Sequence, residues 1–202
     1  MKHVIVSLMA LVFFTPGLLA QDETYLRPAS IGVHFALIDY TTAQRIRSTS
    51  IVGVQREDQW AKLKEMSPGL AISYFKGLKN NIDFAGTISG AYLSMPVGET
   101  SVTTDDKFLM ELDASAQFKL FSDKYLFTPY LNAGVGISYF NEKFGAIIPL
   151  GIGAKFNLFN EAAIFANSQY RVPLTTETNN YHFFHSIGIA GVIGRKKSTD
   201  SN

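Results

Sequence analysis

Apolar and polar residues alternate one by one along much of the chain, and the segment FLMELDASAQFKLF (residues 108–121) shows this most clearly. Every even-numbered position from 108 to 120 is apolar, whereas the odd positions from 111 to 119 are charged or polar. A period of two is typical of a β-strand, because successive strand residues point to opposite faces. Two structures fit this pattern: a soluble sheet whose apolar face packs inward, and a membrane barrel whose apolar face meets lipid.

The same alternation recurs often enough to predict eight strands. Most of the segments match or exceed the about 9–11 residues that a tilted membrane strand requires. Their connections are tight at 78–81, 122–125 and 159–161 but long at 40–67 and 94–107, and this asymmetry is typical of outer-membrane barrels. The predicted strands lie near residues 29–39, 68–77, 82–93, 108–121, 126–139, 144–158, 162–173 and 181–193.

The alternation also divides the strand side chains into two faces. One face is aliphatic, with residues such as Val33, Ile72 and Leu131. The other face is polar and rich in Gly and Ala, and small residues suit the crowded interior of a narrow barrel of about eight strands. A soluble sandwich would not need small residues on its polar face, so the aliphatic face is expected outside. The residues expected inside include His34, Ser73, Asp83, Thr87, Ser89, Asn132, Ser138, Lys155, Asn157, Asn167, Gln169 and Arg171.

Outward-facing aromatic residues favour the membrane barrel over the alternative, a soluble calycin-like barrel. They fall near both ends of the strands and leave an aliphatic band between them, as a bilayer interface selects. A soluble core has no reason to place aromatic residues at both rims. The two predicted girdles are Tyr92, Phe108, Tyr139, Tyr170 and Phe183 beside the long loops, and Tyr74, Phe84, Phe118 and Phe156 beside the tight turns. The predicted fold is all-β, an eight-stranded antiparallel transmembrane barrel.

The N-terminal segment MKHVIVSLMALVFFTPGLLA has a basic start at Lys2, an apolar stretch over residues 4–14 and a small residue at Ala20. This is the pattern of a secretory signal peptide. The alternative, a membrane anchor helix, would need roughly 20 apolar residues. We therefore predict a signal peptide at 1–20, the barrel at 21–194 and a short polar tail at 195–202.

Composition limits the other classes. Charged residues make up 17% of the chain, below the about 25% of a typical soluble domain, which agrees with an apolar outer surface. The net charge of +1 and the lack of a clustered basic surface argue against a nucleic-acid partner. The sequence has no Cys, which excludes disulfides and lipid attachment at a cysteine.

Four stretches resemble the transmembrane barrel of the OmpA family. They are TTAQRIR (41–47), WAKLKEMSPGLA (60–71), LMELDASAQFKLFSDKYLFTPY (109–130) and TTETNNYHF (175–183). The resemblance covers nearly all of the chain after the signal peptide and implies an outer-membrane location. Relatives commonly continue into a periplasmic peptidoglycan-binding domain, whereas this sequence ends at GRKKSTDSN, so a cell-wall tether is not expected. The last strand also lacks the terminal Phe that is usual in the family.

Six charged residues fall on the expected interior face. An isolated charge in a narrow lumen would be costly, so pairing is expected, with Arg171 near Glu111 and Asp113 and with Lys119 near Asp83. These pairs predict a plugged interior; a pathway for ions or small solutes is the alternative. The six residues are Asp83, Glu111, Asp113, Lys119, Lys155 and Arg171.

The segment YHFFHS (181–186) raises the question of a Ser–His hydrolase that acts on lipid. The triad chemistry needs Ser and His within hydrogen-bond reach. His182 and Ser186 share a face but lie four residues apart, about 13 Å along a strand. His185 points to the opposite face, toward the interface. Catalytic residues are therefore not expected.

The segment REDQWAKLKEM (56–66) places Trp60, Leu63 and Met66 at helical spacing before Pro68. It predicts a short amphipathic helix in the first outer loop, either a lid packed on the rim or a surface for a partner. No phosphate-binding loop or metal-ligand cluster is evident, so no cofactor and no metal are expected.

The functional expectation is a non-enzymatic barrel of the outer membrane with a structural or surface-interaction role in the cell envelope. Outer-membrane lipid is the expected partner, and residues 40–67 and 94–107 are candidates for contact with an extracellular partner. The alternatives are a membrane-embedded lipid hydrolase and a small-solute pore.

Overall fold

The structure, a computed structural model, describes residues 26–93, 107–158, 161–175 and 180–194. The predicted signal peptide at 1–20, most of the loop at 94–107 and the tail at 195–202 lie outside the described residues. Within the described residues, no helix is long and apolar enough to cross a membrane.

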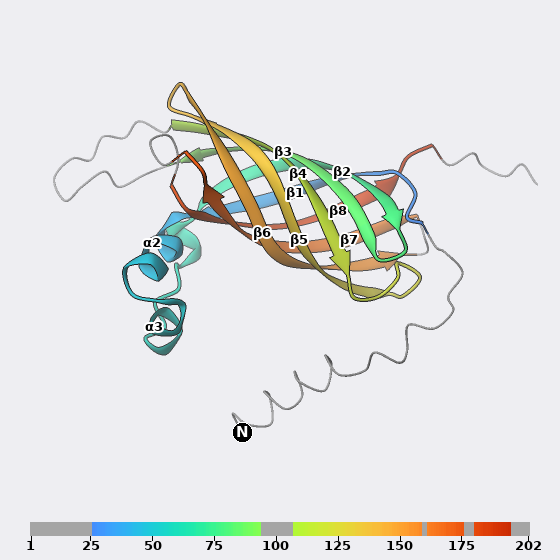
Figure 1. The fold of residues 1–202 in the computed structure, drawn as a ribbon, viewed down its shortest axis with the longest axis horizontal. Coiled ribbons are helices and arrows are strands. Elements are labelled where there is room, and N and C mark those ends of the chain that lie inside the picture. Colours follow the sequence, from blue (N-terminus) through green and yellow to red (C-terminus); the bar gives the residue numbers. More distant parts are fainter. Residues whose placement is uncertain (1–25, 94–106, 159–160, 176–179, 195–202) are drawn as a thin grey trace, which may run out of the picture.

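Eight antiparallel strands form one closed barrel in which each strand pairs with its sequence neighbours and β1 pairs with β8 (Figure 1). This confirms the predicted fold. Two of the strand ends, those of β2 and β4, differ from prediction by two residues, and no end differs by more. The strands are β1 (Ser30–Asp39), β2 (Ser67–Lys79), β3 (Ile82–Leu93), β4 (Lys107–Lys119), β5 (Phe127–Phe140), β6 (Lys143–Leu158), β7 (Ala162–Pro173) and β8 (His182–Val192).

The two ends of the barrel differ in their connections. We call the end that carries residues 40–66, 94–106, 141–142 and 174–181 the loop end, and the end that carries 80–81, 120–126 and 159–161 the turn end. At the loop end, β5 and β6 meet in a two-residue turn. Asn141 and Glu142 both have positive φ (50° and 63°), as the tight turns that match strand twist require.

The connection between β4 and β5 is longer than the tight turn predicted at 122–125. β4 ends at Lys119 and β5 begins at Phe127, so residues 120–126 form the connection. The backbone N–H of Leu120 still donates to the Pro129 carbonyl (3.0 Å), and that of Tyr125 to the Ser122 carbonyl (3.1 Å). The apolar residues Leu120 and Phe121 therefore extended the predicted strand beyond Lys119, where the observed strand ends.

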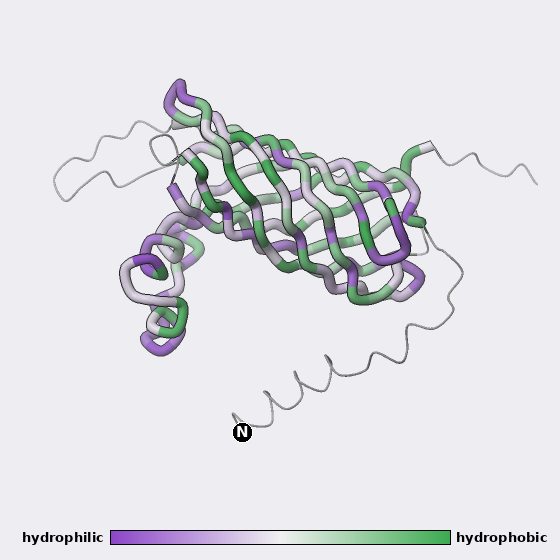
Figure 2. Tube along the Cα trace, viewed as in Figure 1, coloured by the Kyte–Doolittle hydropathy of each residue, from purple (hydrophilic) through white to green (hydrophobic). Residues whose placement is uncertain are grey.

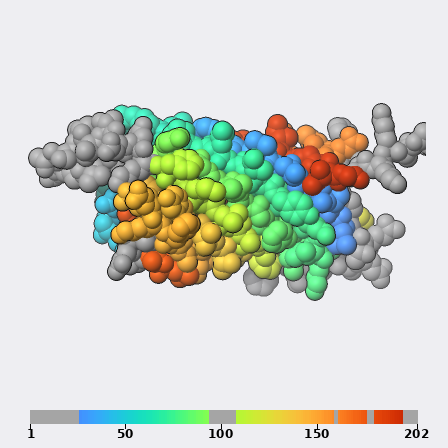
Figure 3. All heavy atoms as spheres, turned by 90° about the horizontal axis from the view of Figure 1, so that it is seen from above, coloured from blue at the N-terminus to red at the C-terminus, as the bar shows by residue number. Residues whose placement is uncertain are grey.

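The apolar strand face lies outside and the polar face lies inside. Val33, Leu131 and Ile152 are 59%, 55% and 63% exposed, whereas interior positions such as Ser73 and Asn132 are buried. Figure 2 shows the hydrophobic and hydrophilic residues alternating along the strands. Figure 3 shows the strands as successive bands across a continuous wall on the face that it views. In water such a wall would be unfavourable, but in lipid it is the required surface.

Two glycines of β5 let this strand lie against the interior side chains of β4. Gly134 is paired with Ser115, and Gly136 is paired with Asp113. A Cβ atom on Gly136 would lie 2.8 Å from Asp113 Cβ and 2.7 Å from the Leu112 carbonyl oxygen. These contacts are closer than real Cβ atoms make, so a side chain here would displace β4 and the Asp113 carboxylate.

The first outer loop contains a helix, as predicted, but it does not lie over 56–66. Two helices, α2 (Tyr40–Ser48) and α3 (Ile51–Arg56), precede that segment. Their first turns are capped by side chains: Asp39 accepts a hydrogen bond from the Thr42 N–H (2.8 Å), and Ser50 accepts one from the Gly53 N–H (3.0 Å).

Residues 57–66 contain only one 3₁₀ turn, η2 (Leu63–Glu65). Trp60 and Leu63 are exposed by 45% and 73%, so they do not pack as a lid on the rim. α3 ends at Arg56, and Asp58 adopts a positive φ of 51°, which breaks the helical path. The helical spacing of Trp60, Leu63 and Met66 was therefore misleading.

The close approach at Gly136 gives a first test of the packing. We expect Gly136→Ala to lower the free energy of unfolding by about 1–3 kcal/mol, because the added methyl group overpacks the β4–β5 contact. The measurement is reversible urea unfolding of the barrel in lipid vesicles.

Gly191→Ala is the matched control, since a Cβ atom there has no heavy atom within 4 Å. It should leave stability unchanged or raise it slightly, because alanine restricts the unfolded chain. Equal losses for the two variants would contradict the interior packing described for β5.

Candidate functional site: the charged interior

The first interior cluster lies toward the loop end and joins β7 to β4 across the lumen. Arg171 Nη1 donates a hydrogen bond to Glu111 Oε2, and Arg171 Nη2 donates to Asp113 Oδ2 at 3.0 Å. Nη2 also donates to Gln169 Oε1 at 3.2 Å. The side chains of Arg171 and Asp113 are completely buried. The structure thus brings together the three residues that the sequence placed at one depth, and one guanidinium bridges two carboxylates.

Aromatic rings surround this cluster. The Arg171 guanidinium carbon lies 4.0 Å from the ring centre of Phe184, and His182 Nε2 lies 3.4 Å from Glu111 Oε2. The Tyr40 ring covers the His182 ring with 4.8 Å between their centres. Burial raises the pKa of the Tyr40 phenol well above its usual range. Tyr40 follows β1 at the loop end, whereas Phe184 is paired with Gln169 and lies closer to the turn end, so the rings contact the cluster from more than one depth.

The second cluster lies toward the turn end. Lys119 Nζ lies 2.7 Å from Asp83 Oδ1 and 2.7 Å from Asp123 Oδ2. Lys155 Nζ donates to Asp83 Oδ2 at 2.8 Å and lies over the rings of Phe75 and Tyr130, 5.3 Å and 5.1 Å from their centres. The expected Asp83–Lys119 pair is present, and Lys155, for which no partner had been assigned, shares the same carboxylate.

Sequence reasoning missed two members of this cluster. Arg27 Nη1 lies 3.9 Å from Asp123 Oδ1, and both side chains are buried although they lie outside the strands. Arg27 also lies over the Phe75 ring at 5.7 Å. An Arg two residues before an expected strand and an Asp in the tight connection predicted at 122–125 were the only available signals. The period of two assigns no face to such residues.

A neutral polar layer includes His34, Ser73 and Thr87 on three neighbouring strands. His34 Nε2 is 2.9 Å from Ser73 Oγ, which is 2.7 Å from Thr87 Oγ1. The His34 ring meets Phe165 edge to face at 5.1 Å between centres. Charges, hydroxyls and aromatic rings therefore fill the interior together.

The residues weighed as a hydrolase site do not come together. His182 faces Glu111, and its Nδ1 atom lies 3.0 Å from the Asn180 carbonyl. Ser186 Oγ is buried without a hydrogen-bond partner. A different pair does form on the outer wall, where Ser168 Oγ lies 2.9 Å from His185 Nδ1. Among the described residues, no carboxylate lies within hydrogen-bond distance of His185.

The residues predicted as aromatic girdles face outward and mostly form pairs. The ring centres are 6.5 Å apart in Tyr74–Phe84, 5.1 Å in Tyr92–Phe108 and 4.9 Å in Tyr170–Phe183. Tyr139 and Phe156 pair with residues outside the predicted set, Phe144 (4.8 Å) and Phe127 (5.0 Å). Phe118 is 47% exposed on the same outer surface.

The described residues contain no group of three or more His, Asp or Glu side chains placed to hold a metal ion. The interior side chains instead bind one another across the lumen. Four carboxylates (Asp83, Glu111, Asp113 and Asp123) meet four cations (Arg27, Lys119, Lys155 and Arg171) in two separate clusters.

Several solved membrane β-barrels are similar to this chain in fold. Neisserial surface protein A is 12% identical with a TM-score of 0.51, and the match covers 84% of this chain and 99% of that one. The N-terminal barrel domain of Pseudomonas aeruginosa OprF is 11% identical (TM-score 0.48; 80% and 96% covered). Ail, the attachment invasion locus protein of Yersinia pestis, is 15% identical (TM-score 0.46; 82% and 96% covered). No protein-family model and no curated protein matches the sequence.

At these identities the likeness shows the fold alone. A closed eight-stranded barrel with an apolar outer wall and a charged, filled interior is a β-barrel of the outer-membrane type. The eight-stranded barrel that the resemblance implied is confirmed as a fold, which the chain shares with Neisserial surface protein A.

The Arg171 cluster gives a second test. We expect Arg171→Met to lower the free energy of unfolding by roughly 3–5 kcal/mol, because two buried carboxylates lose their cation. The triple variant Arg171→Met, Glu111→Gln, Asp113→Asn should recover most of that loss, since no unpaired charge remains. Lys143→Met, at an exposed position outside the two clusters, is the control and should have little effect. A similar loss in Arg171→Met and in the triple variant would mean that the charges do not set the stability here.

Proposed function

We propose that the chain is a non-enzymatic β-barrel of the outer membrane, closed to solutes, that works through its structure and its outer surface. The loop end faces the cell exterior and the turn end faces the periplasm, as in other barrels with short turns on one side. The observation that carries the proposal is the pair of interior ion clusters.

The clusters close the lumen because their partners come from different sides of the barrel. Arg171 of β7 reaches Glu111 and Asp113 of β4, and Lys155 of β6 reaches Asp83 of β3. These strands are not neighbours in the sheet. A side chain that bridges non-adjacent strands crosses the interior. Because two such crossings lie at different depths, a solute that passed through the barrel would have to break buried ion pairs twice.

With the interior committed to packing, the outer surface remains for contact with other molecules. Residues 40–67 and 94–107 supply the two long outer connections. We propose that these connections carry any extracellular contacts, while the wall contacts membrane lipid. An ion or small-solute pathway is the function that the filled interior opposes.

Conductance tests the closed lumen. Reconstituted in planar bilayers, the protein should show no steady single-channel current. The variant Arg171→Met should remain closed as well, because the Asp83 cluster still crosses the interior. Brief openings should appear only when both crossings are removed, as in Arg171→Met with Lys155→Met and Lys119→Met. Steady conductance of the unaltered protein would overturn the proposal in favour of a pore.

The second candidate is a lipid hydrolase, and one observation favours it: the Ser168–His185 contact on the wall that faces lipid. The contact uses Nδ1, whereas an activated serine also needs the imidazole oriented through its other nitrogen by a third group. The Asp39 carboxylate instead caps α2. The pair is better explained as mutual satisfaction of two polar groups on an apolar wall.

Acyl-chain release from phospholipid vesicles separates the two candidates. We expect no release above the rate of vesicles without protein. If release is found, Ser168→Ala and His185→Ala should be compared with Ser186→Ala, which lies on the inner face. Loss of activity in the first two variants alone would make the hydrolase the function of the chain.

A further inference from the structure

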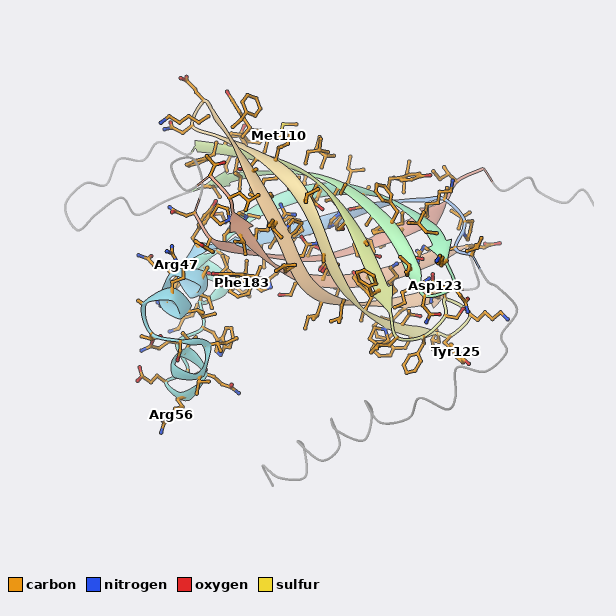
Figure 4. The ribbon with its side chains drawn as sticks, viewed as in Figure 1. Arg47, Arg56, Met110, Asp123, Tyr125 and Phe183 are labelled. Atoms are coloured by element: carbon orange, nitrogen blue, oxygen red, sulfur yellow. The ribbon has the colours of Figure 1, made fainter. Side chains whose placement is uncertain are left out.

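Residues 40–66, which we call the side hairpin, lie beside the barrel and not over its opening. Figure 1 shows α2 and α3 displaced laterally from the loop end, with α3 well away from the barrel axis. Figure 4 places Arg47 and Phe183 close together where α2 meets the wall, and Arg56 at the far end of α3. If a membrane surrounds the barrel, a segment in this position extends along the membrane surface and does not cross it.

The side hairpin is fastened internally, so it is a folded unit. Arg45 Nη1 donates to the Gln59 carbonyl at 2.9 Å, and Arg45 Nη2 lies 3.8 Å from Glu65 Oε1. The Ala61 N–H donates to Thr42 Oγ1 at 2.9 Å. Glu65 also accepts a hydrogen bond from the Lys62 N–H (2.7 Å), which holds the pKa of this carboxyl below its usual range. Residues 59–65 are thereby bound to α2.

A column of aromatic rings joins the side hairpin to the outer wall. The Arg47 guanidinium carbon lies 4.1 Å from the ring centre of Tyr181, which stacks on Tyr170 at 5.8 Å. Tyr170 contacts Phe183 at 4.9 Å, and Phe183 stacks on His185 at 5.6 Å. Tyr170 and Phe183 belong to the predicted girdle, which marks the membrane–water interface. Arg47 therefore sits directly above that interface, at the level of lipid headgroups.

The surface of the side hairpin combines exposed apolar and cationic side chains. Ile51, Val52, Trp60 and Leu63 are 58%, 61%, 45% and 73% exposed. Figure 2 shows hydrophobic and hydrophilic stretches next to each other in α3. Five cations (Arg45, Arg47, Arg56, Lys62 and Lys64) stand against three carboxylates (Glu57, Asp58 and Glu65), a net charge of +2 for these residues.

We propose that the side hairpin is a membrane-surface anchor that lies on the outer leaflet and binds its phosphate-bearing headgroups. This inference rests on the proposed function, because it requires the barrel to span the outer membrane with the loop end outside. Arg47 and Arg56 bind phosphate groups, while Ile51, Val52 and Trp60 enter the interfacial region. The guanidinium carbon of Arg47 lies 4.1 Å from the ring centre of Tyr181, and an arginine over an aromatic ring can still donate its N–H groups to phosphate oxygens.

Two observations favour lipid as the partner of the exposed surface of the side hairpin. First, the side hairpin continues the lipid-facing wall through the Tyr181–Tyr170–Phe183 column, so lipid already borders its inner edge. Second, a segment of short helices and turns with exposed cations and with exposed Trp, Ile and Val has a composition like that of segments that lie in a membrane interface and bind anionic lipids. A soluble protein partner would need neither the lateral position nor this continuity.

Trp60 provides a direct probe because it is the only tryptophan in the chain. The barrel is placed in nanodiscs of phosphatidylcholine alone or of phosphatidylcholine with phosphatidylglycerol. We expect Trp60 fluorescence to be quenched by lipids brominated near the headgroup, and more weakly by lipids brominated deep in the acyl chain. Aqueous acrylamide should quench it severalfold less in the anionic nanodiscs than in detergent micelles.

Variants separate the two parts of the interaction. Arg47→Gln with Arg56→Gln should abolish the difference between anionic and neutral nanodiscs. Ile51→Ser with Val52→Ser should reduce quenching by brominated lipid in both. Lys143→Gln removes an exposed cation at the loop end outside the side hairpin, and it should leave the Trp60 signal unchanged.

A second tryptophan position distinguishes failure of this inference from failure of the proposed function. In a Trp60→Phe background, Leu112→Trp places the probe on the outer wall. If Leu112→Trp is quenched by brominated lipid but Trp60 stays open to acrylamide in every nanodisc, the barrel spans the membrane and the surface anchor is refuted. The hairpin surface would then be open to a soluble partner. If neither position is quenched, the transmembrane barrel itself is wrong.

Discussion

Closure of the sheet is the constraint on which the rest of the structure depends. Inside a bilayer no water is available to satisfy backbone N–H and C=O groups, so a sheet without open edges is the only way to cross with strands. β1 meets β8 in register from Ser30–Val192 to Asp39–Phe183, which removes both edges. Eight strands then set a narrow barrel, and a narrow barrel must be filled by its own side chains.

The filling explains both the glycines and the charges of the interior. Where large charged groups cross the lumen, neighbouring positions must be small, and Gly136 stands directly beside Asp113. Buried charges are costly unless each has a partner, and removing one partner is worse than removing all. The clusters divide unevenly. Two carboxylates face one guanidinium and His182 toward the loop end, whereas two carboxylates face three cations toward the turn end. The charges therefore balance over the whole interior, four carboxylates against four cations, although neither cluster balances by itself.

The strands and their faces could be predicted because the period of two is a local property that closure does not change. Pairs such as Arg171 with Glu111 could be predicted as well, since antiparallel order fixes the depth of each interior residue. Arg27, Asp123 and His182 could not. The first two lie outside the alternating segments, and the contact of His182 with Glu111 depends on the geometry across the lumen. The helix in the first loop was predicted at the wrong residues because spacing alone ignores the caps at Asp39 and Ser50 and the positive φ of Asp58.

The caps also connect the interior to the outer surface. Asp39 is the last residue of β1 and the cap of α2, so the strand end and the helix start share one buried carboxylate. The next residue, Tyr40, covers His182 above the Arg171 cluster, and seven residues later Arg47 contacts Tyr181 on the outside of the wall. One short helix thus contacts the interior through its first residue and the aromatic residues of the outer wall through a residue near its last. The position of α2 is therefore linked to residues on both faces of the wall, and the Asp39 cap fixes where the helix begins.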